Sequence, residues 1–233
     1  MSAADTAAMV LAYPHRAGLP FIVAPAVAGL GFALLWPGFL WLGLAAAAVS
    51  AFFFRDPDRV VPQRPGLILA PADGRVVSIA FAAPPAELGL GDEPRTRVAT
   101  FLSVLDVHVN RAPAAGRVRR IAYRPGAFFN AALDKASEAN ERNAIAIELP
   151  DGRTAAVVQI AGLIARRIVC EAREGETLRA GERIGLIRFG SRVDLYLPEG
   201  AAALVCVGQR MVAGETVVAD LASSEPARTA EKI

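Results

Sequence analysis

The sequence predicts an α+β, mainly β protein, in which an apolar helical hairpin precedes a compact β-sandwich or barrel-like domain. Two features predict this fold class. No charged residue occurs from Leu19 to Phe54, and from Leu67 onward short β-rich runs alternate with glycine and proline turns. Many short strands at close spacing are typical of sandwiches and barrels. A chain of 233 residues is long enough to bury one such core.

The uncharged stretch predicts two short helices, 19–35 and 39–54, joined by a turn at the Pro-Gly pair 37–38. A single transmembrane helix needs about 20 apolar residues, and this stretch is much longer. Arg16 precedes the stretch and Arg55 follows it. Positive charge at both ends favours a hairpin whose two ends lie on the cytoplasmic side of a membrane.

Residues 1–58 are therefore expected to associate with the cell membrane at its cytoplasmic face. Each helix is short for a full span, so the association is peripheral or a shallow insertion. A secretory signal peptide fits less well, because its apolar region is shorter and no small-residue cleavage pattern follows Phe54. A buried hairpin in the core of a soluble protein stays open as the alternative.

Residues 59–221 are expected to form one β domain. Val193 and Leu195 alternate with Arg192 and Asp194, which is the two-residue period of a half-buried strand. The segment from Pro125 to Arg142 is the exception and predicts a loop with a short helix at 128–133. The expected strands are 75–82, 97–104, 117–123, 144–149, 154–160, 183–189 and 192–197.

Segments 174–182 and 207–215 resemble each other within the β domain. Each has a glycine, a five-residue gap, a second glycine and a glutamate. The pattern predicts the two halves of a lipoyl-like β-sandwich, without the hairpin lysine that a lipoyl carrier needs. Residues 222–233 are small and polar and predict a disordered tail.

Composition excludes several function classes. The net charge of +2 and the scattered arginines do not indicate a nucleic-acid partner. His15 and His108 lie far apart, and with Cys170 and Cys206 they show no metal-site spacing, so no metal is expected. The two cysteines need no disulfide framework. One of the two lysines lies in the tail, which leaves pyridoxal-phosphate chemistry a single candidate.

The pair Gly190-Ser191 lies between two expected strands, so its ordinary interpretation is a hairpin turn. The same geometry permits a second interpretation, in which the serine hydroxyl attacks the open carbonyl of the glycine and shifts the acyl group from nitrogen to oxygen. β-Elimination of that ester leaves dehydroalanine, which hydrolyses to an N-terminal pyruvoyl group and ammonia. The pair alone does not decide between the two interpretations.

His108 is the only histidine in the expected β domain, and it is either a structural residue of a sheet or a general acid–base. Its ordinary pKa of about 6.5 allows it to take and return a proton near neutral pH. Asp73 precedes Gly74 after a proline and is either part of an ordinary turn or a carboxylate that orients the imidazole. With Ser191 the two would form a relay in the chain order Asp, His, Ser.

These motifs belong to a longer ordered set. The set comprises Phe54-Arg55-Asp56-Pro57, Pro71-Ala72-Asp73-Gly74, the segment from Asp106 to Pro113, Asn140-Glu141-Arg142-Asn143, Gln159-Ile160-Ala161-Gly162 and Phe189-Gly190-Ser191. In order and content the set resembles the phosphatidylserine decarboxylase proenzyme family, from the apolar N-terminus to about Leu221. The chain is similar to the short branch, which cleaves a Gly-Ser pair where the longer branch has Leu-Gly-Ser-Thr. Arg192 stands where that threonine would be, which marks the branch.

The resemblance implies self-cleavage between Gly190 and Ser191. Ser191 would be the nucleophile and then the source of a covalent pyruvoyl cofactor. Gly190 would end the large chain, and residues 191–233 would form the small chain. His108 would activate the serine, and Asp73 would orient His108.

The resemblance also implies the reaction. The pyruvoyl ketone would condense with the amine of phosphatidylserine and accept the electron pair released as carbon dioxide leaves. A proton from His108 and hydrolysis would then give phosphatidylethanolamine, a step of phospholipid biosynthesis. The expected partners are phosphatidylserine, membrane lipid and the two chains of one precursor.

Two rival functions stay open, as does homo-oligomerisation. A decarboxylase of another serine lipid, such as an ether-linked archaeal analogue, would use the same head-group chemistry. A membrane-anchored β-sandwich that binds a partner without chemistry would keep one intact chain. That second rival leaves the joint presence of Asp73, His108 and Gly190-Ser191 unexplained.

Overall fold

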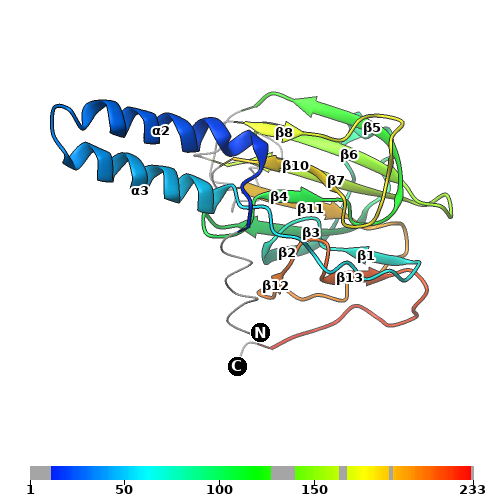
Figure 1. The fold of residues 1–233 in the computed structure, drawn as a ribbon. Coiled ribbons are helices and arrows are strands. Elements are labelled where there is room, and N and C mark those ends of the chain that lie inside the picture. The colour runs from blue at the N-terminus through cyan, green and yellow to red at the C-terminus, as the bar shows by residue number, and fades with distance from the viewer. Residues whose placement is uncertain (1–11, 127–139, 163–166, 189–190, 232–233) are drawn as a thin grey trace. The chain divides into compact units, whose positions relative to one another are not determined.

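The chain forms two compact units, residues 1–58 and 59–233. Figure 1 shows the helices of the first unit and the labelled strands of the second. The computed structural model describes residues 12–126, 140–162, 167–188 and 191–231.

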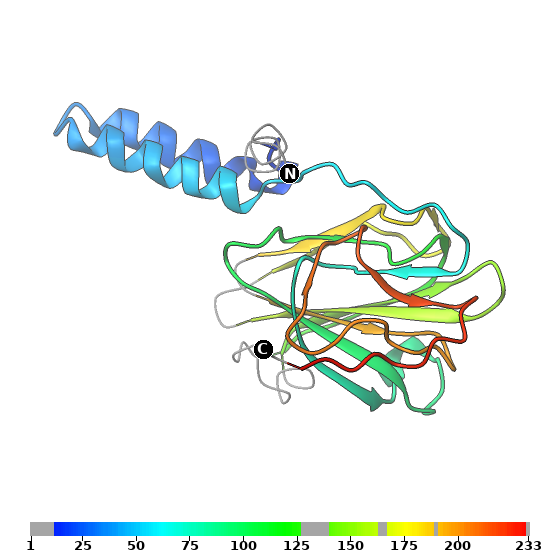
Figure 2. The same ribbon diagram turned by 90° about the horizontal axis from the view of Figure 1, so that it is seen from below.

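The first unit is a pair of antiparallel helices. A short 3-10 helix, η1 (Arg16–Gly18), leads into α2 (Leu19–Phe32), and α3 (Gly38–Phe53) follows after a turn. The two helices lie side by side in both views (Figure 1 and Figure 2). Where they touch, a Cβ atom on Gly29 would lie 2.8 Å from the Cα atom of Gly43. Glycine permits this close approach of two backbones, as small residues do between membrane helices.

Backbone hydrogen bonds close the base of this hairpin. The N–H of His15 donates to the carbonyl of Phe54 at 2.7 Å, and the N–H of Asp56 donates to the carbonyl of Tyr13 at 3.1 Å. The first helix ends at Phe32, three residues before the predicted end, and residues 33–35 form the turn. Within the described ranges, no helix combines the length and the apolar character that a bilayer crossing requires.

The described residues of the second unit form short strands and one 3-10 helix, η2 (Ala86–Leu88). The strands are β1 (Leu67–Leu69), β2 (Gly74–Ala82), β3 (Arg95–Leu102), β4 (Val109–Arg111), β5 (Gly116–Arg124), β6 (Arg142–Glu148), β7 (Thr154–Ala161), β8 (Ile168–Cys170), β9 (Thr177–Leu178), β10 (Arg183–Ile187), β11 (Ser191–Tyr196), β12 (Arg210–Met211) and β13 (Val217–Asp220).

Among the described residues these strands form three antiparallel sheets. The largest is curled and has the order β12-β2-β3-β11-β7-β6-β5-β9 (Figure 1). A three-stranded sheet has the order β4-β10-β8, and β1 pairs with β13. The mainly β fold with two N-terminal helices agrees with the prediction from sequence.

The main core joins the large sheet to the three-stranded sheet. On β11, Val193 and Leu195 face this core, whereas Tyr196 faces a smaller apolar cluster on the other side. Ile184 and Ile187 enter the main core from β10. Burying one such aliphatic side chain contributes about 1.5–3 kcal/mol. This packing holds β4 and β10 against the inner face of β11 and its neighbours.

Two halves of the second unit repeat one arrangement. Residues 70–76 are Ala-Pro-Ala-Asp-Gly-Arg-Val, and residues 112–118 are Ala-Pro-Ala-Ala-Gly-Arg-Val. In each half a glycine N–H donates to the carbonyl of the first alanine. The two bonds are Gly214 to Ala70 and Gly181 to Ala112, both 2.9 Å long. The two similar glycine-rich segments therefore take equivalent places, one beside β2 and the other beside β5.

Two other expectations have different outcomes. The short helix expected at 128–133 lies outside the described residues. The tail expected to be disordered makes specific contacts. The backbone N–H of Arg228 donates to the carbonyl of Ala203 at 3.1 Å, and its guanidinium donates to the backbone carbonyl of Leu204 at 3.1 Å. The composition of the segment does not reveal these hydrogen bonds, because their acceptors lie elsewhere in the domain.

Candidate functional site

Ser191 is the first residue of β11 and lies between two strands. It is directly opposite Leu102 on β3 and Ala161 on β7, and its side chain is fully buried. Its Oγ atom has no hydrogen-bond partner among the described residues. A buried hydroxyl without a partner costs about 1–3 kcal/mol, so the fold keeps this group at the expense of stability. Gly190, on the other side of the predicted cleavage bond, lies outside the described residues.

His108 directly precedes β4 and lies beside the last residue of β10, the strand that precedes β11. The chain leaves β3, turns through residues 103–106 and places the carbonyl of His108 3.3 Å from the N–H of Ile187. The ring is buried, and its Nδ1 atom lies 2.9 Å from the carbonyl oxygen of Asp106. A carbonyl oxygen only accepts, so Nδ1 carries the hydrogen. A neutral ring then keeps its lone pair on Nε2.

The turn before His108 is held by the side chain of Asp106. Its carboxylate accepts hydrogen bonds from the N–H of Ser103 at 2.8 Å and from the Oγ of Ser103 at 2.6 Å. It also pairs with Arg210 on β12. Because the backbone carbonyl of the same aspartate binds the imidazole, the turn fixes both the orientation and the tautomer of His108.

Asp73 lies in the bend before β2, in one half of the repeat. The corresponding residue of the other half is Ala115. The Asp73 carboxylate accepts two hydrogen bonds from Arg59, at 3.0 and 2.8 Å, and one from the N–H of Ala213 at 2.8 Å. Burial raises the pKa of Asp73, and the Arg59 charge opposes this effect. The repeat therefore carries a buried carboxylate in one half only.

Asp73 and His108 lie on segments that are bonded to each other. The N–H of Arg111 donates to the carbonyl of Pro71 at 2.8 Å, which ties the bend before Asp73 to β4, the strand that follows His108. The negative charge of Asp106 contributes to the raised pKa of Asp73, so the two carboxylates lie within electrostatic range. The hydrogen bonds of Asp73 among the described residues are the three given above, and none is to His108.

Three buried amide side chains near Ser191 were not among the predicted site residues. The Nδ2 of Asn143 donates to the Oε1 of Gln159 at 2.9 Å, and the Nε2 of Gln159 donates to the Oδ1 of Asn110 at 2.8 Å. Gln159 lies two residues from Ala161, the partner of Ser191, and on the same face of β7. Amides at inward-facing positions of apolar strands are the signal in the sequence that could have identified them.

The opposite face of β11 carries a buried ion pair. Arg192 donates from Nε and Nη2 to the two carboxylate oxygens of Asp194, at 2.6 and 3.1 Å, and both side chains are 1% exposed. This strand is thus buried on both faces, and the prediction of a half-buried strand was wrong. The ion pair explains how these two charged side chains can be buried, because each charge neutralises the other. Because Arg192 directly follows Ser191, the pair also anchors the backbone beyond the predicted cleavage bond.

The surroundings of residue 191 fit a pyruvoyl group formed in place. The position is buried and held between two strands, and the Nδ2 of Asn110, on β4 of the three-stranded sheet, is buried with no partner among the described residues. A small group with carbonyl oxygens can use such an N–H donor as a hydrogen-bond partner. The described residues contain no cluster of three or more His, Cys, Asp or Glu side chains that could hold a metal ion.

Known proteins share this sequence over most of its length. The family described as phosphatidylserine decarboxylase matches residues 46–219. The phosphatidylserine decarboxylase proenzyme of Granulibacter bethesdensis is 64% identical over 221 residues, which are 95% of this chain and 91% of that protein. Its counterpart in Gluconacetobacter diazotrophicus is 62% identical over 225 residues, 95% of this chain and 100% of that protein. That of Cereibacter sphaeroides is 57% identical over 215 residues, 92% of this chain and 93% of that protein.

Proposed function

The chain belongs to the phosphatidylserine decarboxylase family, and on this premise we propose that it is a self-processing enzyme that converts phosphatidylserine to phosphatidylethanolamine and carbon dioxide. Its cofactor is a pyruvoyl group made from Ser191. The observation that carries the proposal is the Ser191 hydroxyl, which is buried at the start of a central strand and has no partner among the residues that the structure describes. A hydroxyl that is not used for structure is available as a nucleophile. The proenzyme names of the relatives fit processing of this kind.

Self-processing needs a base for the Ser191 hydroxyl, and His108 supplies it. The carbonyl of Asp106 binds the hydrogen on Nδ1 and leaves Nε2 to take the serine proton. His108 is also the only histidine of the second unit. The burial of both side chains keeps water from competing for the proton.

Processing also needs a fixed backbone at the bond that breaks. Pairing with β3 and β7 holds Ser191, and the ion pair with Asp194 holds Arg192 on the other face. Cleavage between Gly190 and Ser191 yields a large chain that ends at the glycine. The small chain, residues 191–233, keeps its place because β11 remains a central strand of the sheet.

Asp73 assists His108 through the electrostatics of the site. Its carboxylate lies within range of Asp106, whose backbone carbonyl orients the His108 ring. Negative charge in this region favours the imidazolium that forms when His108 takes a proton. Arg59 keeps the Asp73 side chain in place for this role.

During turnover the pyruvoyl group, once formed, supplies the electron sink for the loss of carbon dioxide. His108 holds the proton that the decarboxylated carbon atom takes up. The apolar side chains of Val193 and Leu195 line the same strand face and help to exclude water. A dry site favours the loss of a carboxylate charge.

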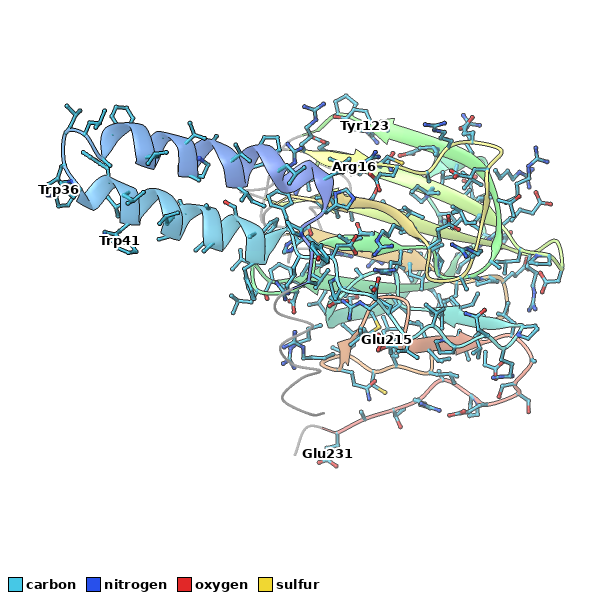
Figure 3. All side chains as sticks on the ribbon, in the orientation of Figure 1. Arg16, Trp36, Trp41, Tyr123, Glu215 and Glu231 are labelled. Carbon is cyan, nitrogen blue, oxygen red and sulfur yellow. The ribbon has the colours of Figure 1, made fainter. Side chains whose placement is uncertain are left out.

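A lipid substrate requires an enzyme at a membrane, and the first unit provides the attachment. Large apolar side chains are exposed at its turn, with Leu34 92%, Leu35 79%, Trp36 57% and Trp41 71% exposed. Trp41 points away from the helices (Figure 3), and the Trp36 ring packs edge-on against Phe39 with 5.4 Å between ring centroids. Contiguous exposed apolar surface marks a membrane or partner contact, and tryptophan favours the membrane interface. The hairpin therefore associates with the cytoplasmic face of the cell membrane, peripherally or by shallow insertion.

The domain organisation follows from the same proposal. Residues 1–58 associate with the membrane, residues 59–221 carry the decarboxylase, and residues 222–233 form a tail. The repeat of residues 70–76 at 112–118 supports a lipoyl-like arrangement of the β domain.

The reaction is tested by supplying phosphatidylserine in detergent micelles to the purified protein. We expect phosphatidylethanolamine and carbon dioxide in equal amounts from the native chain, and neither from Ser191→Ala. Decarboxylation by the Ser191→Ala variant would refute the assignment of the cofactor.

A further inference from the structure

Within the described part of the chain, three buried hydrogen-bonding atoms without a partner lie near the inner face of β11. They are the Oγ of Ser191, the Oγ1 of Thr100 and the Nδ2 of Asn110, each on a residue that is 0% exposed. Thr100 is directly opposite Val193, which shares a strand face with Ser191. Folded proteins leave few buried polar atoms unsatisfied, so their concentration here indicates a place built to receive another polar group.

Asn110 is the fixed donor of this set. Gln159 donates a hydrogen bond to its Oδ1 atom, and Asn143 donates one to Gln159 in turn. The Asn110 amide therefore cannot rotate without breaking its hydrogen bond with Gln159. In both hydrogen bonds of this row of amides an N–H donates to a carbonyl oxygen. The donor that stays unused at the end of the row, among the described residues, is the Nδ2 of Asn110. Gln159 is opposite Val193 on the β7 side, which places the row of amides beside the inner face of β11.

We propose that the Nδ2 of Asn110 donates a hydrogen bond to the ketone oxygen of the pyruvoyl group at residue 191, with Gln159 and Asn143 as positioning residues. This inference rests on the proposed function, because the ketone exists only after Ser191 has been converted. Ser191 pairs with Leu102 on β3 and with Ala161 on β7, and of the two carbonyl oxygens of the pyruvoyl group we assign the ketone at Cα as the one that meets the amide. A fixed donor at this oxygen holds the ketone in one orientation and polarises its carbon atom.

The ketone can be observed on its own by isotope-edited infrared spectroscopy. In protein grown on serine labelled with carbon-13 at Cα, the ketone of residue 191 is the labelled carbonyl, because unconverted serines keep that carbon saturated. A hydrogen bond lowers the stretching frequency of a carbonyl group. We therefore expect the labelled band at a lower frequency in the native protein than in Asn110→Leu.

Thr100→Val is the matched control for this experiment. It removes another buried polar atom for which the described residues offer no partner, near the same face of β11, but leaves the three hydrogen-bonded amides intact. We expect its ketone band at the native position. An unchanged band in Asn110→Leu, or a shift caused by Thr100→Val alone, overturns the proposal.

A second variant covers the case in which Asn110→Leu is not processed. Asn143→Leu leaves Asn110 in place but frees Gln159 from its partner, so we expect a smaller upward shift of the band. An unshifted band there overturns the positioning role of the row of amides. A native ketone frequency equal to that of a free pyruvoyl amide in an apolar solvent overturns the hydrogen bond itself. Complete absence of a labelled ketone in the native protein would instead refute the proposed function.

Discussion

Arg59 binds Asp73 through both oxygens of its carboxylate, at 3.0 and 2.8 Å, across 14 residues of sequence. The Arg59 side chain is 2% exposed, so this is a pair inside the protein rather than on its surface. The repeated half of the domain has Ala115 where Asp73 stands. The carboxylate of Asp73 thus occurs in only one of the two repeated segments. This is the segment that is hydrogen-bonded to β4, the strand that follows His108.

Replacing Arg59 by glutamine should destabilise the protein strongly. Removing one partner of a buried pair typically costs about 3–5 kcal/mol, because the other charge stays buried. Arg64→Gln is the matched control, since Arg64 pairs with Asp220 while its side chain is 55% exposed, and such pairs contribute about 0–1 kcal/mol. Thermal unfolding should be measured in an uncleaved Ser191→Ala background, so that one chain unfolds. Equal losses for the two variants would contradict a buried role for Arg59.

The contribution of Asp73 to stability should depend on pH. Burial raises its pKa above the ordinary value of 3.8, although Arg59 opposes the shift. A group whose pKa is raised by folding contributes stability below its unfolded pKa and loses it as pH rises through the folded value. The unfolding temperature of the native sequence relative to Asp73→Asn should therefore fall between about pH 3 and pH 7. A rise over this range would show that the Arg59 charge outweighs burial.

The contact of the two helices should not tolerate a side chain at Gly43. A Cβ atom there would lie 2.5 Å from the carbonyl oxygen of Pro25, which is backbone and cannot move aside alone. Gly31→Ala is the control, because nothing lies within 4 Å of a Cβ atom at that position. In detergent, Gly43→Ala should lower the melting temperature of the helical circular dichroism signal, whereas Gly31→Ala should leave it equal or higher. Equal melting of the two variants would refute the close contact.

Charged residues at the tip of the hairpin should weaken membrane binding. Changing Trp36 and Trp41 to glutamate removes two exposed aromatic side chains and adds charges that an anionic surface repels. We expect a several-fold loss of protein recovered with sedimented phospholipid vesicles. Phe81→Glu is the control, since Phe81 is 80% exposed but lies on β2. Unchanged recovery of the double variant would show that the hairpin tip is not the membrane contact.

Local patterns in the sequence were sufficient for the helices and the general class of the β domain. The uncharged stretch and the proline-glycine turn predicted two helices, and the structure has α2 and α3 there. The Asp-Gly pair at 73–74 predicted a turn, and the structure shows why glycine is needed at position 74. A Cβ atom on this residue would lie 2.2 Å from the carbonyl oxygen of Phe101, so the close approach of β2 and β3 requires glycine.

The remaining features depend on residues far apart in sequence. The strands β9 and β12 have two residues each, and only pairing with distant strands defines them. Likewise, Gln159 and Asn110 are 49 residues apart, and neither neighbourhood reveals that their amides meet in the core. The partner of Asp73 could not be predicted either, because Arg59 comes from the start of the domain and approaches only in the folded chain.

The central claim is that Ser191 is both the nucleophile of self-cleavage and the source of the pyruvoyl group. The intact masses of the purified chains test it most directly, with His108→Gln as a variant expected to slow the cleavage. We predict two chains divided between Gly190 and Ser191, the small one lighter by one ammonia than a peptide that begins with serine. A single full-length chain in protein that decarboxylates phosphatidylserine would contradict the account.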